Sequence, residues 1–291
     1  MSLPTSASEH PTTSLGPRTD PTGPANSLRV LRTFFRNSLV REMQFRWNFL
    51  AEVASHAFWF STQLLFFHLV FGNVREINGW TSAEYHGFMA TGMILNALME
   101  AFFVPNLANL SELVRTGGLD FALLKPIDTQ FLISFEKVDL GALFQLLLPL
   151  GLLGHAVATG AGTVSLGQVV AYLAFLLLAL LFYYSLMLVF ASTSVWLGRN
   201  QGLYEFWFYI TIFARYPRDI YQGSLIADSV RFAFSYLLPI LLVVTVPARI
   251  IVGKVLEPHW VGWMLIATLV ALVLSRFIFH RALASYRSAS S

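Results

Sequence analysis

LGALFQLLLPLGLLGHAVATGAGTVSLGQVVAYLAFLLLALLFYYSLMLVFASTSVWLG, residues 140–198, contains no Asp, Glu, Lys or Arg. A helix needs about 20 consecutive apolar residues to cross a lipid bilayer. The stretch is therefore long enough for two crossings with a neutral turn between them. It predicts an integral membrane protein.

The composition of the whole chain agrees with this prediction. Of its 291 residues, 56% are hydrophobic and 12% are charged, whereas an ordinary soluble domain has about 25% charged residues. The absence of Cys excludes disulfides, thiolate metal sites and a cysteine nucleophile. The net charge is only +3, and no basic patch interleaved with aromatic residues stands out, so we expect no nucleic-acid partner.

Length and charge-free content predict an all-α, polytopic membrane protein with about six transmembrane helices. The first 26 residues are rich in Pro, Ser and Thr and lack the apolar core of a secretory signal, so we expect a disordered tail there. The membrane domain is expected over 27–287, followed by a short tail over 288–291. The expected spans are 48–71, 86–104, 140–160, 168–197, 232–251 and 260–279.

An amphipathic helix is expected before the first span, over residues 28–46. Arg29, Arg32 and Arg36 share one side of this helix, and Leu and Phe side chains occupy the other. This pattern suits a helix lying in the membrane surface, with its basic groups toward lipid phosphates. The alternative is the ordinary basic flank of a first span.

The distribution of Lys and Arg predicts the orientation. Placing the N-terminus in the cytoplasm puts 16 of the 19 Lys and Arg on the cytoplasmic side. Because cytoplasmic loops carry the excess of basic residues, both termini are expected there.

Two apolar segments in the last third of the chain are less regular. Residues 202–217 are short and carry Glu205, which favours an interfacial or re-entrant piece over a full span. A seventh span is the competing interpretation. In the expected fifth span, Pro239 and Pro247 each remove a backbone hydrogen bond, so this span is expected to be broken.

The loop expected at 105–137 contains LVRTGGLDFALLKPID, residues 113–128, between two very apolar segments. A short helix is expected to end at Gly117 in a left-handed cap. A second element is expected from Asp120, as N-cap, to Leu124, and is stopped by Pro126. The loop is therefore expected to be structured and to expose Leu and Phe side chains.

Three short motifs together resemble those of a known family. They are the loop sequence above, INGW at residues 77–80 and ARYPRDIY at residues 214–221. In this order and topology the chain resembles the permease subunits of type-two ABC exporters, and in particular a little-characterised bacterial branch with six spans. The resemblance covers about residues 28–287.

This resemblance implies a separate ATPase that binds ATP and Mg, a second permease subunit (a paralogue or a second copy), membrane lipids as surroundings, and the bacterial inner (plasma) membrane as location. It also implies that the 107–126 loop docks onto the ATPase as a coupling element. The residues implied in this coupling are Leu107, Leu110, Glu112, Leu113, Val114, Arg115, Asp120, Lys125 and Pro126.

The chain itself has no GxxxxGK[ST] phosphate loop and no metal-ligand or Ser-His-Asp pattern, so we expect a non-catalytic subunit without a cofactor of its own. Polar residues inside the spans are candidates for the passage or for the dimer seam, or they hold helices together by local hydrogen bonds. These residues are Glu52, His56 and Gln63 in the first span, and Asn96 and Glu100 in the second.

The alternative function is an ion- or proton-coupled secondary transporter. Glu52, His56, Glu100 and His155 would then form a proton relay. The four residues lie at different depths, and no second half repeats the pattern, which favours the exporter.

Overall fold

The computed structural model describes residues 30–38, 46–160, 162–197, 209 and 211–286, apart from the side chains of residues 46–49 and of Glu52. Helices dominate this part of the chain. After a helix over residues 30–38, the helices and strands are α2 (Arg46–Asn73), β1 (Glu76–Ile77), β2 (Trp80–Thr81), α3 (Ser82–Phe102), α4 (Val104–Ala108), α5 (Leu110–Thr116), α6 (Gly118–Leu123), α7 (Thr129–Phe135), α8 (Leu140–Phe144), α9 (Leu147–Thr159), α10 (Leu166–Leu197), η1 (Phe213–Arg215), η2 (Arg218–Ile220), α12 (Leu225–Phe232), the π-helical turn η3 (Ala233–Leu237), α13 (Ile240–Ile251) and α14 (Pro258–Ser285).

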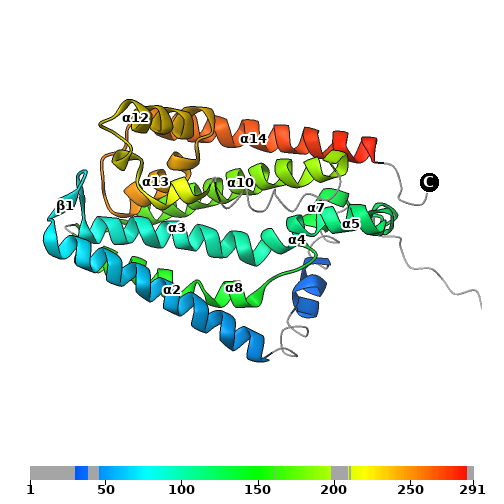
Figure 1. The fold of residues 1–291 in the computed structure, drawn as a ribbon, viewed down its shortest axis with the longest axis horizontal. Helices are drawn as coiled ribbons and strands as arrows, with labels where there is room; N and C mark the ends of the chain where they lie inside the picture. Colours follow the sequence, from blue (N-terminus) through cyan, green and yellow to red (C-terminus); the bar gives the residue numbers. More distant parts are fainter. Residues whose placement is uncertain (1–29, 39–45, 161, 198–208, 210, 287–291) are drawn as a thin grey trace, which may run out of the picture.

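The long helices run between two ends of the molecule (Figure 1). One end, here called the hairpin end, carries the antiparallel strands β1 and β2. Their turn uses positive φ angles of 47° at Asn78 and 78° at Gly79, a conformation that Asn and Gly tolerate best. The other end, called the loop end, carries α4 to α7 (Figure 1).

Helix α13 forms the centre of the core. Eleven of its 12 residues are buried, and Arg249 is the exception, so protein surrounds this helix on nearly every side. It packs against α10 and α3, and α10 packs along α14. Helix α2 lies at the periphery, with its Phe67 and Phe71 rings against Tyr85 of α3.

The all-α membrane fold is confirmed. Within the described part, three segments are long and apolar enough to cross a membrane, namely 140–159, α10 and α14, or up to five if each of two bent helix pairs is one span. Helix α2 has 28 residues, which gives a length of about 42 Å at 1.5 Å per residue. It is long enough to cross, although His56, Gln63 and His68 make it more polar. The count of six stays a prediction.

The predicted fifth span is broken, as expected, and its chain bends by 82° between Leu237 and Ile240. The break lies at Pro239, which precedes α13, whereas Pro247 lies inside the helix. With 12 residues, α13 is about 18 Å long, against a bilayer core of about 30 Å.

The prediction that residues 232–251 cross the whole membrane is nevertheless wrong. Asp219, before α12, accepts a hydrogen bond from Trp80 in the hairpin, and Lys254, after α13, donates one to the carbonyl of Gly79. The chain therefore enters and leaves at the hairpin end, and 221–251 is a re-entrant hairpin. Hydropathy missed this because a buried half-helix is as apolar as a full span.

The end of α10 and the helix η2 lie at opposite ends of the molecule. Helix α10 packs against α4 and α5 near its end, so Leu197 lies at the loop end, and Asp219 lies at the hairpin end. The interfacial or re-entrant piece expected at 202–217, and the seventh span that competes with it, stay predictions. Half of that segment, residues 202–208 and 210, lies outside the described residues.

The first described helix and the end of α14 both lie at the loop end. Ser38 accepts a hydrogen bond from the backbone N–H of Val138 (3.0 Å), and Arg276 of α14 binds Asp128 before α7. In the predicted interfacial helix, Arg32 and Arg36 are exposed. Arg29, the tails at 1–26 and 288–291, and residues 39–45 lie outside the described residues. That the loop end faces the cytoplasm stays a prediction.

Candidate functional site

The predicted coupling loop is folded onto the end of the bundle. Helix α5 ends at Gly117 with φ 72°, in the left-handed cap that the sequence predicts. The second element begins earlier than predicted, at Gly118, so Asp120 lies in its first turn and is not its N-cap. A short helix α7 follows, and Asp128 caps it by accepting a hydrogen bond from the N–H of Phe131 (2.9 Å).

The predicted coupling residues divide into buried and exposed groups. Leu107 and Leu110 are 1% and 0% exposed, so their side chains hold the loop against the core rather than reach its surface. Leu113 and Val114 are half-buried against the same core. The exposed group is Glu112 and Arg115, which form an ion pair, together with Lys125 and Pro126.

An apolar patch on the loop is a better candidate for the contact with a partner than the predicted coupling residues are. Phe121, Leu123 and Leu124 are 73%, 41% and 81% exposed, and we call these three residues the loop patch. The sequence predicted exposed Leu and Phe in this loop, but not which ones. The helix α6 has only six residues, which are too few for an amphipathic pattern to show which side chains face outward.

A polar network ties the loop to two long helices. The Arg276 guanidinium of α14 donates to both oxygens of Asp128 (3.2 and 2.7 Å) and to Oε1 of Gln130 (2.8 Å). Gln130 in turn donates to the Tyr184 hydroxyl of α10 (2.9 Å), which also bonds with Ser134 (2.9 Å). Arg276 thereby holds the pKa of the Asp128 carboxyl below its usual range. A displacement of the loop would therefore act on α10 and α14 directly.

A cavity of about 620 Å³ lies between α2 and the rest of the bundle. Such a volume is in the range of sites for small ligands. Four of the five residues predicted for the passage or the dimer seam line it: His56, Gln63, Asn96 and Glu100. The fifth, Glu52, has no described side chain. The alternative interpretation, that these residues hold helices together by local hydrogen bonds, stays a prediction.

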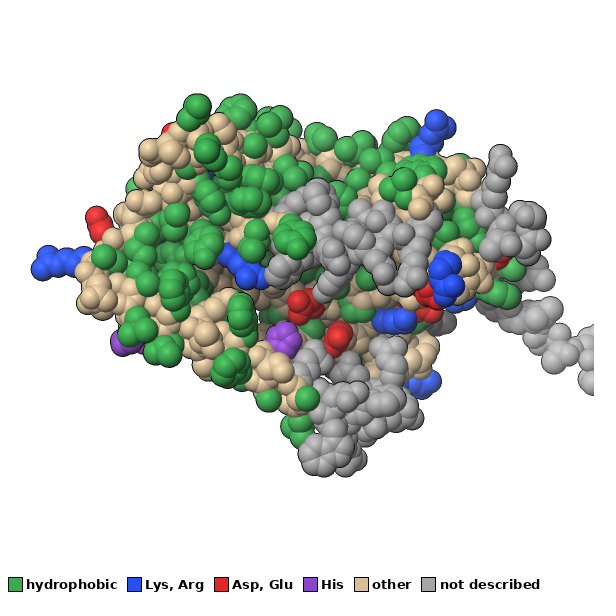
Figure 2. Space-filling view, viewed as in Figure 1, with side chains coloured by type: hydrophobic (Ala, Val, Ile, Leu, Met, Phe, Trp, Pro, Cys, Tyr) green, Lys and Arg blue, Asp and Glu red, His purple; other side chains and the backbone are tan. Residues whose placement is uncertain are grey.

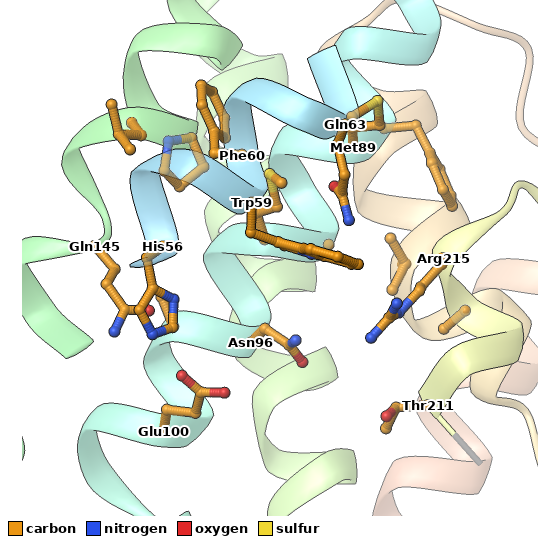
Figure 3. Close-up of a pocket in the computed structure, with 18 of the residues that line it drawn as sticks. His56, Trp59, Phe60, Gln63, Met89, Asn96, Glu100, Gln145, Thr211 and Arg215 are labelled. Atoms are coloured by element: carbon orange, nitrogen blue, oxygen red, sulfur yellow. The ribbon is translucent and has the colours of Figure 1, made fainter. Parts of the chain in front are cut away.

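The cavity combines polar groups from separate parts of the chain. Figure 3 shows His56, Gln145, Asn96 and Glu100 on one side, Arg215 and Thr211 on the other, and Trp59 between them. Arg215 appeared in the sequence analysis only as part of the ARYPRDIY motif, and neither it nor Thr211 or Gln145 was assigned to this site, because nothing local relates them to α2 or α3.

The lining mixes polar and apolar side chains along the bundle axis, with Thr62 and Gln63 on the hairpin side and Met99 and Val104 on the loop side. On α3 the lining residues Phe88, Met89 and Met93 precede Asn96 and Glu100, which lie nearer the loop end. On the α2 side His56 lies nearer the loop end than Phe60 and Phe67. Figure 2 shows a mostly hydrophobic face whose charged side chains lie at its two ends and in a central hollow.

A second polar cluster closes the hairpin end. Asp219 accepts hydrogen bonds from the Trp80 indole (2.8 Å) and from the Arg249 guanidinium (2.6 Å). The guanidinium carbons of Arg218 and Arg249 lie 4.6 and 4.7 Å from the ring centroid of Trp260, close enough for cation–π attraction. This cluster unites the INGW and ARYPRDIY motifs, which lie far apart in the sequence.

The structure places no group of three or more His, Asp or Glu suited to a metal ion among the residues it describes. A family model described as "ABC-2 family transporter protein" matches residues 57–290, which is most of the chain. No curated protein and no solved structure matches the sequence.

Proposed function

The chain belongs to the ABC-2 family of transporter proteins and is a membrane-spanning permease, and from this premise we propose that it is one subunit of an ATP-driven exporter. A separate ABC ATPase hydrolyses ATP, and the chain works in the inner membrane of a bacterium as a dimer, with a second copy or with a paralogous permease.

The observation that carries this proposal is the loop patch. Phe121, Leu123 and Leu124 project at the loop end, outside the long helices that cross the membrane. Apolar side chains on a water-facing surface cost free energy unless a partner covers them. The ATPase is the partner that an ABC-2 permease requires, and it supplies the phosphate loop that this chain lacks.

The polar network gives the patch a mechanical connection. When the ATPase subunits close on ATP, they push on α5 and α6. Asp128 and Gln130 pass this displacement to α14 through Arg276, and Ser134 and Gln130 pass it to α10 through Tyr184. The long helices then tilt and open the transport path toward the hairpin end.

The peripheral helix α2 is the element we assign to the dimer. Its side chains Phe58, Leu65, Phe66 and Leu69 are more than half exposed. In this assignment they contact the second permease subunit.

A secondary transporter remains the alternative. Of its predicted relay, His56 and Glu100 line the cavity, whereas His155 is exposed on α9 and is absent from the described lining. The structure thus places two of the four predicted relay residues in one cavity, and family membership favours ATP as the energy source.

Substitution of the loop patch tests the proposal. We expect the double variant Phe121→Asp and Leu124→Asp to reduce co-purification of the ABC ATPase with the tagged permease at least about tenfold, because each substitution places a charge in an apolar contact. Val255 is 83% exposed and follows α13 toward the hairpin end, so Val255→Asp is the matched control.

Size-exclusion chromatography and thermal unfolding show whether each variant is folded. An ATPase yield with the folded double variant equal to that of the wild type would contradict the assignment of the patch.

A further inference from the structure

Three polar side chains that line the cavity beside α2 have hydrogen-bonding groups without a partner. They are His56 and Gln63 of α2 and Asn96 of α3. Within the described part of the chain, none of the three side chains donates or accepts a hydrogen bond. Thr62 also lines the cavity, but its hydroxyl donates to the carbonyl of Phe58 (2.9 Å). The cavity therefore retains the hydrogen-bonding capacity of two carboxamides and an imidazole.

The two carboxamides favour a ligand that both donates and accepts hydrogen bonds. Each has two N–H donors and an acceptor oxygen. In Figure 3 the carboxamides of Gln63 and Asn96 point into the cavity, on either side of the Trp59 ring. A polar group without a hydrogen bond in apolar surroundings costs free energy. A bound molecule that offers acceptors and donors to both carboxamides recovers this free energy.

The charges of the lining favour an uncharged ligand. Among the described lining residues, Glu100 and Arg215 are the Asp, Glu, Lys and Arg side chains present, and each already interacts with another group of the chain. A ligand with net charge therefore meets no free side chain of opposite sign from this set. An uncompensated charge in surroundings of low dielectric is costly, whereas carboxamides bind neutral polar groups without this cost.

An aromatic surface lies between the two carboxamides. The Trp59 side chain is 54% exposed and lines the cavity. Its indole offers a flat apolar face on which the ring of a ligand can stack, and its N–H is a further donor. Phe60 and Met89 extend this apolar surface. The volume of about 620 Å³ is in the range of sites for small ligands.

We propose that this cavity binds an uncharged ring compound that carries hydroxyl groups, with the hydroxyl groups on Gln63 and Asn96 and the ring on Trp59. A hydroxyl group both donates and accepts, so it can bind either end of a carboxamide. This assignment rests on the proposed function, because it names the cargo class of the permease. Binding itself requires neither ATP nor the ATPase, so the two proposals can fail separately.

Binding of matched phenyl compounds to the full-length permease tests the proposal. With the permease in lipid nanodiscs and empty nanodiscs as blank, isothermal titration calorimetry measures the dissociation constants of phenyl glucoside, its tetra-O-methyl ether, phenyl phosphate and phenyltrimethylammonium. The ether keeps the ring and the acceptors but has no donor, and the other two analogues carry a charge. We expect phenyl glucoside to bind at least about tenfold more tightly than each analogue, a difference of about 1.4 kcal/mol.

Two variants remove the carboxamides at nearly constant volume. Gln63→Met and Asn96→Leu are each expected to weaken the binding of phenyl glucoside about tenfold. Because neither carboxamide has a hydrogen bond to lose, the midpoint of thermal unfolding without ligand should not fall. Asn73→Leu is the matched control, because Asn73 is exposed at the end of α2, outside the described lining, and its carboxamide donates to the carbonyl of Leu69 (2.8 Å). Its binding of phenyl glucoside should equal that of the wild type.

Several results would overturn the proposal. They are the absence of saturable binding of phenyl glucoside, equal binding of any of its analogues, and unchanged binding in both carboxamide variants. A loss in Asn73→Leu as large as that in Asn96→Leu would overturn it as well, because the effect would not belong to the cavity. These results leave the separate test with the ATPase untouched.

Discussion

Asp128 makes two separate stabilising interactions at the start of α7. Its carboxylate accepts a hydrogen bond from the N–H of Phe131, as a helix N-cap, and it binds Arg276 of α14. Asn preserves the first interaction and loses the charge of the second, whereas Ala loses both. The pair of substitutions therefore distinguishes capping from the connection between the loop and the bundle.

We expect Asp128→Asn to lower the free energy of unfolding at neutral pH by about 0.5 to 1 kcal/mol, the scale of an exposed ion pair. Asp128→Ala is expected to cost about 1 kcal/mol more, because the cap is lost as well. Chemical denaturation of the purified protein, followed by tryptophan fluorescence, measures both differences.

The effect of Asp128→Asn should depend on pH. The folded protein lowers the pKa of Asp128, so the ionised carboxylate stabilises the fold above the ordinary pKa of Asp and this contribution is lost as pH falls through the lowered pKa. The difference between the wild type and Asp128→Asn should therefore be constant near pH 7 and shrink as the pH falls below about 4, the ordinary pKa of Asp. A difference independent of pH would show that the ion pair with Arg276 contributes nothing.

At the scale of single elements, apolar content alone does not distinguish a crossing from a re-entrant hairpin. Helix α13 is buried on nearly every side, and its sequence therefore reads as a span. The proline at 239 correctly predicted the break. The return of the chain to the hairpin end depends on contacts of Asp219 and Lys254 with the hairpin, which are more than 130 residues away in sequence.

Single cysteines test this re-entrant hairpin, because the natural chain has none. Gln222, before α12, and Val255, after α13, are both exposed. We expect Gln222→Cys and Val255→Cys to react with a membrane-impermeant maleimide from the same side of the membrane, and Leu124→Cys from the opposite side.

Sealed spheroplasts and inverted vesicles give the two orientations. Labelling of Gln222→Cys and Val255→Cys from opposite sides would mean that the segment between them crosses the membrane.

The candidate site was only partly predictable from the sequence. The spacing of four residues between Asn96 and Glu100 places both on one helix face, and the structure brings them into one cavity with His56. Arg215 comes from a different segment, and only the folded chain places it opposite. Leu107 and Leu110 illustrate the reverse case, because an apolar stripe on a short helix predicts burial but not whether the core or a partner covers it.

At the scale of the whole molecule, the two ends have different compositions and different tasks. The hairpin end is fixed by the Asp219, Trp80 and Arg249 cluster. The loop end carries an exposed apolar patch and connects through Arg276 to α14. In the proposed mechanism, a push at the loop patch is transmitted toward the hairpin end along the long helices that join the two ends.

The central claim is that an ABC ATPase docks on the loop patch, and site-specific crosslinking tests it most directly. Leu124→Cys is combined with a short bifunctional thiol-reactive crosslinker in membranes, and the captured chain is identified by mass spectrometry. Val255→Cys serves as the control at the hairpin end. The account predicts that Leu124→Cys, and not Val255→Cys, captures a protein with a GxxxxGK[ST] phosphate loop. Capture at Val255, or no such protein captured at Leu124 or at the neighbouring positions Phe121 and Lys125, would contradict it.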